Sequence, residues 1–176
     1  QQNAKNGWSY SNYRHTFLLR NIFVQAMQFR LMELMMQEDA PYLGAGPGVD
    51  QFSASDVLWS FNANTDVDKS MEGLEALLEE IARWKKHGIT ESELARVKEE
   101  ILSNYESSYI DRDNQKSSAL AEELIRCFVY NESVPGIEKE FEIAKNLMAE
   151  ITKEEVDAFT RTVLEESSQS IQFLLP

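Results

Sequence analysis

Cysteine, histidine and long apolar runs are scarce or absent in this chain of 176 residues. The only cysteine, Cys127, leaves no partner for an intrachain disulfide. It lies in the apolar segment LIRCFVY, a setting typical of a buried and unreactive thiol. No apolar run approaches the ~20 residues that a membrane-spanning helix needs. The sequence therefore predicts no membrane span.

Basic residues are also few: the chain has 17 Lys and Arg but 30 Asp and Glu, which gives a net charge of −13. Residues 1–50 hold four basic and four acidic groups, so the whole excess of 26 acidic over 13 basic groups lies in residues 51–176. Such a surface repels phosphate backbones. Nucleic acid is not expected as a partner. The adjacent acidic pairs Glu79/Glu80, Glu99/Glu100 and Glu154/Glu155 are expected on solvated helix faces.

Known catalytic and metal-binding patterns are missing as well. The two histidines, His15 and His87, lie far apart, and the motifs HExxH, HxxEH and GxSxG do not occur. Three glycines at 44, 46 and 48 precede a strand pattern, whereas a phosphate-binding loop leads into a helix. The sequence thus predicts no catalytic residue, no metal ligand and no cofactor within this chain.

The spacing of apolar residues predicts a mainly helical chain with a small sheet. Helical periods cover residues 11–37, 68–87, 91–109, 111–130, 136–148 and 151–166, and strand patterns cover 44–49, 51–66 and 170–176. These elements predict a two-layer α+β fold in which several helices cover one face of the sheet. Because the chain enters a helix at once, a strand that belongs before Trp8 is expected to be missing or supplied elsewhere. We assign residues 1–10 to a flexible or residual segment and 11–176 to one domain.

One polar constellation is of interest, YIDRDNQKSS, in which Arg112 lies between Asp111 and Asp113. Two interpretations remain open. The three side chains form an ion-pair cluster at a helix start, or they face a substrate or an interface.

The order of several short motifs resembles a known family. A Gly-Ile-Thr run opens a helix, and the residues shared with the family are Gly88, Ile89, Thr90, Glu93, Leu94, Arg96 and Lys98. The segments Asp39 to Gly44 (DAPYLG) and Pro135 to Glu138 (PGIE) also match. In this order the chain resembles the insulinase or pitrilysin-type zinc metallopeptidases, the inverzincins, and most of all the large bacterial members built from four homologous domains.

The resemblance implies a fold with a mainly antiparallel sheet and a division of labour between domains. In this family an N-terminal domain holds zinc, while related domains without metal close a chamber around a peptide. A chain without the zinc motif resembles a non-catalytic domain, most of all the second. It would be inactive alone and would act with sibling domains, a peptide substrate and zinc in a full-length protein of the periplasm or cell envelope. The alternative is a scaffold or interaction module of an inactive family member.

Tyr42 matches a family tyrosine that holds the substrate backbone together with an arginine seven residues earlier. Met35 occupies that arginine position, so Tyr42 has no transferred role and is only a candidate for a substrate-facing or interface-facing residue. The missing first strand further predicts an exposed sheet edge. Either the chain self-associates through this edge, or the residues before Tyr10 fold back and cover it.

Thr90 and Glu93 are spaced as a capping box. Substituting Thr90 with Ala should lower the free energy of unfolding by about 1 kcal/mol, because a helix N–H loses its acceptor. Thermal melting of the two proteins measures this. An unchanged melting temperature would mean that the box does not form.

Overall fold

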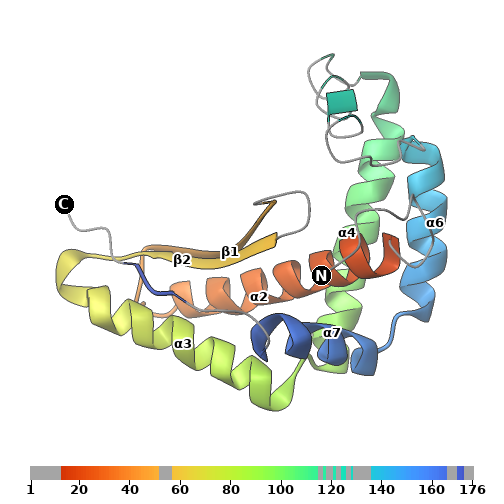
Figure 1. The fold of residues 1–176 in the computed structure, drawn as a ribbon. Coiled ribbons are helices and arrows are strands. Elements are labelled where there is room, and N and C mark those ends of the chain that lie inside the picture. The colour runs from red at the N-terminus through yellow and green to blue at the C-terminus, as the bar shows by residue number, and fades with distance from the viewer. Residues whose placement is uncertain are drawn as a thin grey trace.

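A hairpin of two antiparallel strands lies across two long helices in the central part of the structure (Figure 1). The structure, a computed structural model, describes residues 13–51, 57–114, 117, 121, 124–125, 128, 136–165 and 170–172. Its central elements are η1 (Tyr13–Leu19), α2 (Arg20–Met35), β1 (Gly44–Gln51), β2 (Val57–Asn64), η2 (Val67–Lys69) and α3 (Ser70–His87). One layer is the hairpin and the other is helical, so the predicted two-layer α+β fold is confirmed.

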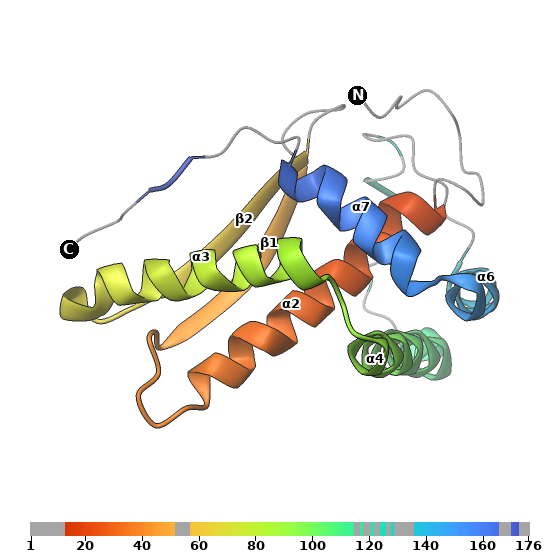
Figure 2. The ribbon, with the colours of Figure 1, turned by 90° about the horizontal axis from the view of Figure 1, so that it is seen from below.

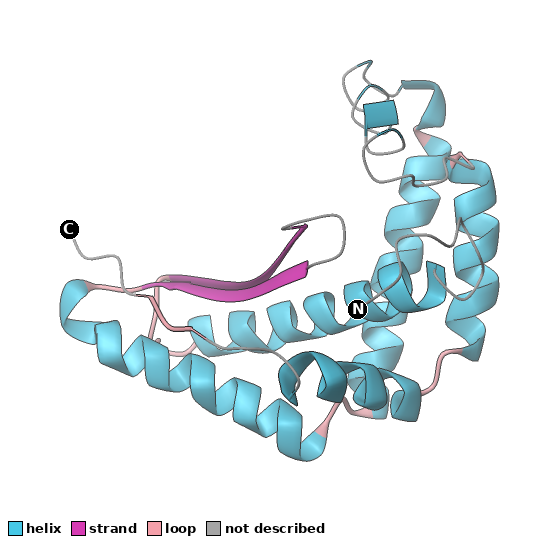
Figure 3. Cartoon of the chain, viewed as in Figure 1, coloured by secondary structure: helices cyan, strands magenta, loops and turns pink. Residues whose placement is uncertain are grey.

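Three further helices complete the helical layer. Helices α4 (Glu91–Ile110) and α6 (Ile137–Glu150) lie side by side at one end of the molecule, and α7 (Lys153–Glu165) crosses near η1 (Figures 1 and 2). Figure 3 shows that helices predominate in the described part of the chain. No helix among the described residues has the length and apolar character needed to cross a membrane.

The strand alternation read from the sequence decides which face of the hairpin meets the helices. On β2, Trp59 and Phe61 pack against the core, whereas Asn62 and Asn64 are exposed. On β1, a side chain at Gly46 would meet the Oε1 atom of Gln28 at 2.6 Å. A larger residue there would displace the Gln28 amide, which donates to the Ala45 carbonyl oxygen at 3.3 Å.

Aromatic side chains join the two layers. Phe23 of α2 is fully buried, with its ring centroid 5.4 Å from that of Trp59 and 5.0 Å from that of Trp84. The indole N–H of Trp84 donates to the Thr160 hydroxyl oxygen at 3.0 Å, which ties α3 to α7. These contacts place the core between the hairpin, α2, α3 and α7.

Two sequence predictions differ from the structure. Residues 170–172 are exposed and belong to no strand, and the rest of the strand predicted over 170–176 lies outside the described residues. The sheet of the described residues accordingly has two strands and not three. The helix predicted from residue 111 begins as a tight turn, η3 (Arg112–Asn114), because the Asn114 N–H bonds to the Asp111 carbonyl oxygen. Residues 117, 121, 124, 125 and 128 are helical.

The expectations for Cys127 and for residues 1–10 lie outside the described residues.

Candidate functional site at the junction of α3 and α4

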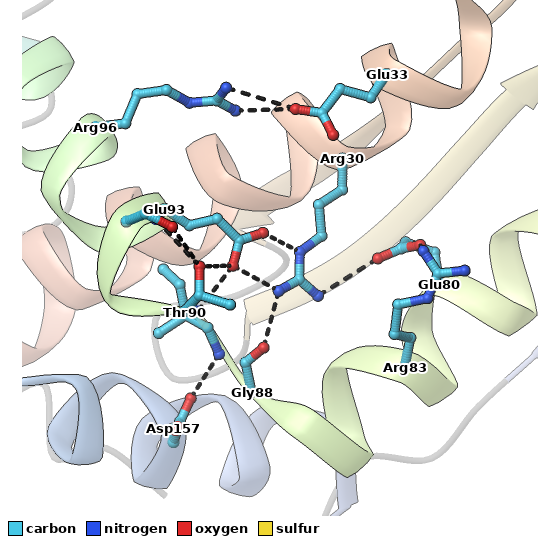
Figure 4. A network of polar contacts seen from close by, with 11 residues as sticks. Arg30, Glu33, Glu80, Arg83, Gly88, Thr90, Glu93, Arg96 and Asp157 are labelled. Atoms are coloured by element: carbon cyan, nitrogen blue, oxygen red, sulfur yellow. Dashed lines mark hydrogen bonds and ion pairs between the residues drawn. The ribbon is translucent and has the colours of Figure 1, made fainter. Parts of the chain in front are cut away.

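Arg30 occupies the centre of a polar network between α2, α3 and α4 (Figure 4). Its Nε donates to Glu93 Oε1 at 2.6 Å and its Nη2 to Glu93 Oε2 at 2.9 Å, a two-point contact that fixes the orientation of both groups. The same Nη2 donates to the Gly88 carbonyl oxygen at 2.8 Å. The guanidinium also lies 4.4 Å from the centre of the Trp84 ring, a cation–π contact.

Glu80 is the most deeply buried charged residue of this network. Its side chain is 1% exposed, and its carboxylate lies 3.4 Å from Arg30 Nη1 and 2.8 Å from Arg83 Nη1. A buried carboxylate is stable only with such partners. Glu80 therefore corrects the expectation that the acidic pair Glu79/Glu80 lies on a solvated face.

The Gly-Ile-Thr motif forms the turn at this junction. Gly88 has φ +67°, and a side chain there would collide with the Asp157 carboxylate. The Ile89 N–H donates to Asp157 Oδ1 at 2.9 Å, which holds α7 against the turn. Next in the chain, the Thr90 hydroxyl accepts from the Glu93 N–H while the Glu93 carboxylate accepts from the Thr90 N–H, so the predicted capping box is confirmed.

Electrostatic effects at Glu93 oppose one another. Burial raises its pKa, but hydrogen bonds from Arg30 and Thr90 stabilise the carboxylate and lower the pKa from 4.5 to about 2. Glu93 is therefore a permanent anion at neutral pH, and it is not poised to exchange a proton.

A shallow groove of about 410 Å³ runs beside the network. Arg30, Glu80 and Glu93 form its floor together with Glu33, Leu34, Gln37, Arg83, His87, Gly88 and Thr90. Arg30 pairs with Glu80 and Glu93, and Arg83 also pairs with Glu80 (Figure 4). Glu33 pairs with Arg96, which lies outside the groove. The groove presents a charged surface, but its paired groups hold the helices in position.

Tyr42 lies in the core. The residue is 2% exposed, and its hydroxyl donates to the Leu31 carbonyl oxygen at 2.9 Å. Burial raises its pKa to about 12. This corrects the expectation of a substrate-facing or interface-facing position, because the side chain is fully used in joining the loop after α2 to that helix.

Asp111, Arg112 and Asp113 are exposed at the end of α4. Arg112 donates from Nη1 to the Tyr109 carbonyl oxygen at 2.8 Å and lies 4.5 Å from the centre of the Tyr109 ring. The arginine is thus held by α4 itself. An interface role for the three residues stays a prediction.

The residues of this site that sequence reasoning missed are Arg30 and Glu80. Arg30 pairs with Glu80, 50 positions away, and with Glu93, 63 positions away, so no local spacing in the sequence indicates these contacts. A weak signal was available, because Glu80 falls in the same helical stripe as Leu77 and Trp84, which are both buried.

Among the residues that the structure describes, no three His, Cys, Asp or Glu side chains are grouped so that they could hold a metal ion. His15 lies on η1 and His87 at the end of α3, on different elements.

Comparisons with known proteins show similarity to zinc proteases. A zinc protease PQQL-like protein of Arabidopsis thaliana is 27% identical over 143 residues, which are 81% of this chain and 12% of the relative. No family model matches the chain. The chain therefore spans a small fraction of this relative.

Solved structures confirm the fold. The first half of the periplasmic protease PqqL from Escherichia coli matches 90% of this chain with a TM-score of 0.82 and 19% identity, over 34% of its own length. The complete PqqL matches equally well, with 18% identity over 17% of its length. A predicted insulinase family protease from Yersinia pestis has a TM-score of 0.70 and 11% identity, with 89% of this chain and 33% of that protein covered.

The resemblance predicted from motif order is confirmed, since the relative is a zinc protease PQQL-like protein and one of the structures that share the fold is a predicted insulinase family protease. Both PqqL structures share this fold over 90% of the chain.

The low pKa of Glu93 predicts acid sensitivity. Glu93→Gln should lower the free energy of unfolding at neutral pH by about 2 kcal/mol, because Arg30 loses a charged acceptor. A group with a lowered folded-state pKa stabilises the fold above its unfolded pKa and loses that effect as the pH falls. The difference between wild type and variant should therefore be constant above pH 4.5 and shrink toward pH 2.

Urea unfolding across this pH range provides the measurement. Glu99→Gln is the matched control, since Glu99 is exposed on the same helix. A difference for Glu93→Gln that does not change with pH would contradict the charged pairing with Arg30.

Proposed function

We propose that this chain is a non-catalytic domain of a zinc-dependent protease, which encloses the peptide substrate while another domain of the same polypeptide holds the metal. The observation that carries the proposal is the fit to the first half of PqqL, in which the shared fold covers 34% of the neighbour. The remaining length leaves room for a sibling domain. In this proposal residues 11–176 form one domain.

The composition of the chain supports the non-catalytic assignment. Inverted zinc motifs need two histidines and a glutamate at HxxEH spacing, and the two histidines here are 72 positions apart, at 15 and 87. The residues of this chain do not fit a zinc site, so we derive no chemical step through a metal in it.

The hairpin supports the enclosing role. Its inner face packs on helices, whereas the described elements leave its outer face uncovered (Figure 1). That outer face carries Ser60, Asn62 and Asn64, whose hydroxyl and amide groups donate and accept hydrogen bonds. A polar face of this kind suits contact with the backbone of an extended peptide.

A second candidate is a scaffold in an inactive relative of these proteases. Every buried side-chain nitrogen or oxygen among the described residues has a hydrogen-bond partner, as in a purely structural domain. The two candidates predict different sequences for the rest of the polypeptide. HxxEH with a downstream glutamate there favours the protease, and its absence favours the scaffold.

The compartment follows from the same proposal. PqqL is a periplasmic protease, and we propose a periplasmic or cell-envelope location for a bacterial source of this chain.

The purified chain should cleave no peptide, and a longer polypeptide carrying HxxEH should cleave an unstructured peptide in a chelator-sensitive manner. In that polypeptide, Asn62→Ala together with Asn64→Ala should raise KM several-fold with little change in kcat, because substrate hydrogen bonds are lost. Glu100→Ala, on the exposed side of α4, serves as the control.

Kinetic assays of the purified chain, the longer polypeptide and its two variants decide the matter. Stoichiometric zinc and chelator-sensitive cleavage in the purified chain would refute the non-catalytic assignment. An unchanged KM in the double variant would refute the enclosing role of the hairpin.

We also propose that the free edges of the hairpin pair with strands outside the described residues, because a two-stranded sheet is marginal alone. The purified chain should self-associate at high concentration in salt that screens its charge, and an extension that restores the upstream strand should abolish this. Sedimentation velocity tests both. A strict monomer without the extension would contradict the pairing.

A further inference from the structure

The end of α3 is the most basic part of this acidic chain. Its last residues, 83–87 (RWKKH), contain three of the 17 Lys and Arg, and no other window of five residues contains as many. Arg161 of α7 adds a fourth cation, because the bond from the Trp84 indole to the Thr160 hydroxyl holds the two helices side by side (Figure 2). A local group of cations therefore stands out on a molecule whose net charge is −13.

These cations surround a small hollow of about 100 Å³ between α3 and α7, which we name the basic hollow. Trp84 and Thr160, each 1% exposed, form its floor. Lys85, Lys86 and Arg161 are exposed at its rim. Since a water molecule needs only about 10–15 Å³ of such space, the hollow has room for the few heavy atoms of a carboxylate.

The positive charge of the rim is not neutralised by its neighbours. Asp157 is the one acid among the described residues that line the hollow, and both its carboxylate oxygens already have partners, the Ile89 N–H and Lys153 Nζ. Within the part of the chain that the structure describes, the three cations of the rim form no ion pair and no side-chain hydrogen bond. The basic hollow therefore offers unpaired positive charge to an incoming anion.

The dipole of α3 explains only part of this charge. Basic residues in the last turn of a helix stabilise the negative end of its dipole, which accounts for Lys85 and Lys86. Arg161 belongs to α7 and precedes the last turn of that helix, which contains no basic residue. Its presence at the rim is thus not required by either helix end.

We propose that the basic hollow binds an acidic side chain of a partner peptide, with Lys85, Lys86 and Arg161 as the ion-pair partners of its carboxylate. This interaction lies on the helical side of the molecule and does not depend on the protease assignment.

The donors of the hollow favour a carboxylate over a phosphate group. Phosphate sites typically use free backbone N–H groups at the N-terminus of a helix, whereas this hollow lies at the C-terminus of α3. The backbone N–H groups of Gly88 and Ile89 are already bonded, to the Trp84 carbonyl oxygen and to Asp157. Only side-chain cations remain, and the excess of acid over the whole chain disfavours a polyanion such as nucleic acid.

Fluorescence anisotropy of a labelled hexaglutamate peptide with the purified chain, at low ionic strength, tests the proposal. Hexaglutamate should bind, and hexaglutamine should bind about ten-fold more weakly, because three surface ion pairs are lost. Equal binding of the two peptides would overturn the proposal. Displacement of hexaglutamate by inorganic phosphate more readily than by acetate, at equal ionic strength, would overturn the choice of a carboxylate.

A pair of triple variants separates the basic hollow from the overall charge. Lys85→Gln with Lys86→Gln and Arg161→Gln should weaken hexaglutamate binding about ten-fold. The matched control removes three positive charges from other exposed sites, through Arg112→Gln, Lys139→Gln and Lys145→Gln. This control has the same net charge and should bind as the wild type does. Equal weakening in both variants would contradict a local site, and circular dichroism checks that both are folded.

Lysine acetylation followed by mass spectrometry gives an independent measurement on the unaltered chain. Lys85 and Lys86 should be acetylated several-fold more slowly when hexaglutamate is present, because the peptide covers their amino groups. Lys145, exposed on α6, should keep its rate. Equal slowing of the three lysines would show a diffuse attraction of the peptide and would overturn the proposal.

Discussion

The arrangement of the helices depends on the pairing of one largely buried cation, Arg30. Its side chain is 12% exposed, so the guanidinium must find acceptors within the protein. Helix α3 supplies Glu80, the turn supplies the Gly88 carbonyl and α4 supplies Glu93. Loss of any partner leaves a charge with poor solvation. This requirement fixes α2, α3 and α4 relative to one another, and the bond from Ile89 to Asp157 extends the constraint to α7.

Local features of the fold were readable from the sequence, and long-range ones were not. The capping box at Thr90 depends on two residues three positions apart. The alternation of buried and exposed side chains around Trp59 depends on neighbours along one strand. By contrast, Arg30 reads as an ordinary surface residue of a helix, because its partners come from other elements. Tyr42 was misjudged for a related reason: motif matching carries no information about burial.

The similarity to PqqL rests on the fold, whereas the candidate site has a structural task. The similarity to PqqL concerns the whole arrangement of elements, at 19% identity. The Gly-Ile-Thr motif recovered from the sequence performs a structural task, since its backbone atoms bind Arg30 and Asp157. In this chain the motif therefore forms a helix junction.

The contacts of α2, the hairpin and α3 differ from those of α7 in the length of chain that they close. Helix α2, the hairpin and α3 follow one another in the chain, so their contacts close short loops and form at low entropic cost. The bonds from Arg14 to Glu155 and from Ile89 to Asp157 span 141 and 68 positions. Because the contacts of α7 close much longer loops, we expect α7 to dock after α2, the hairpin and α3 have assembled.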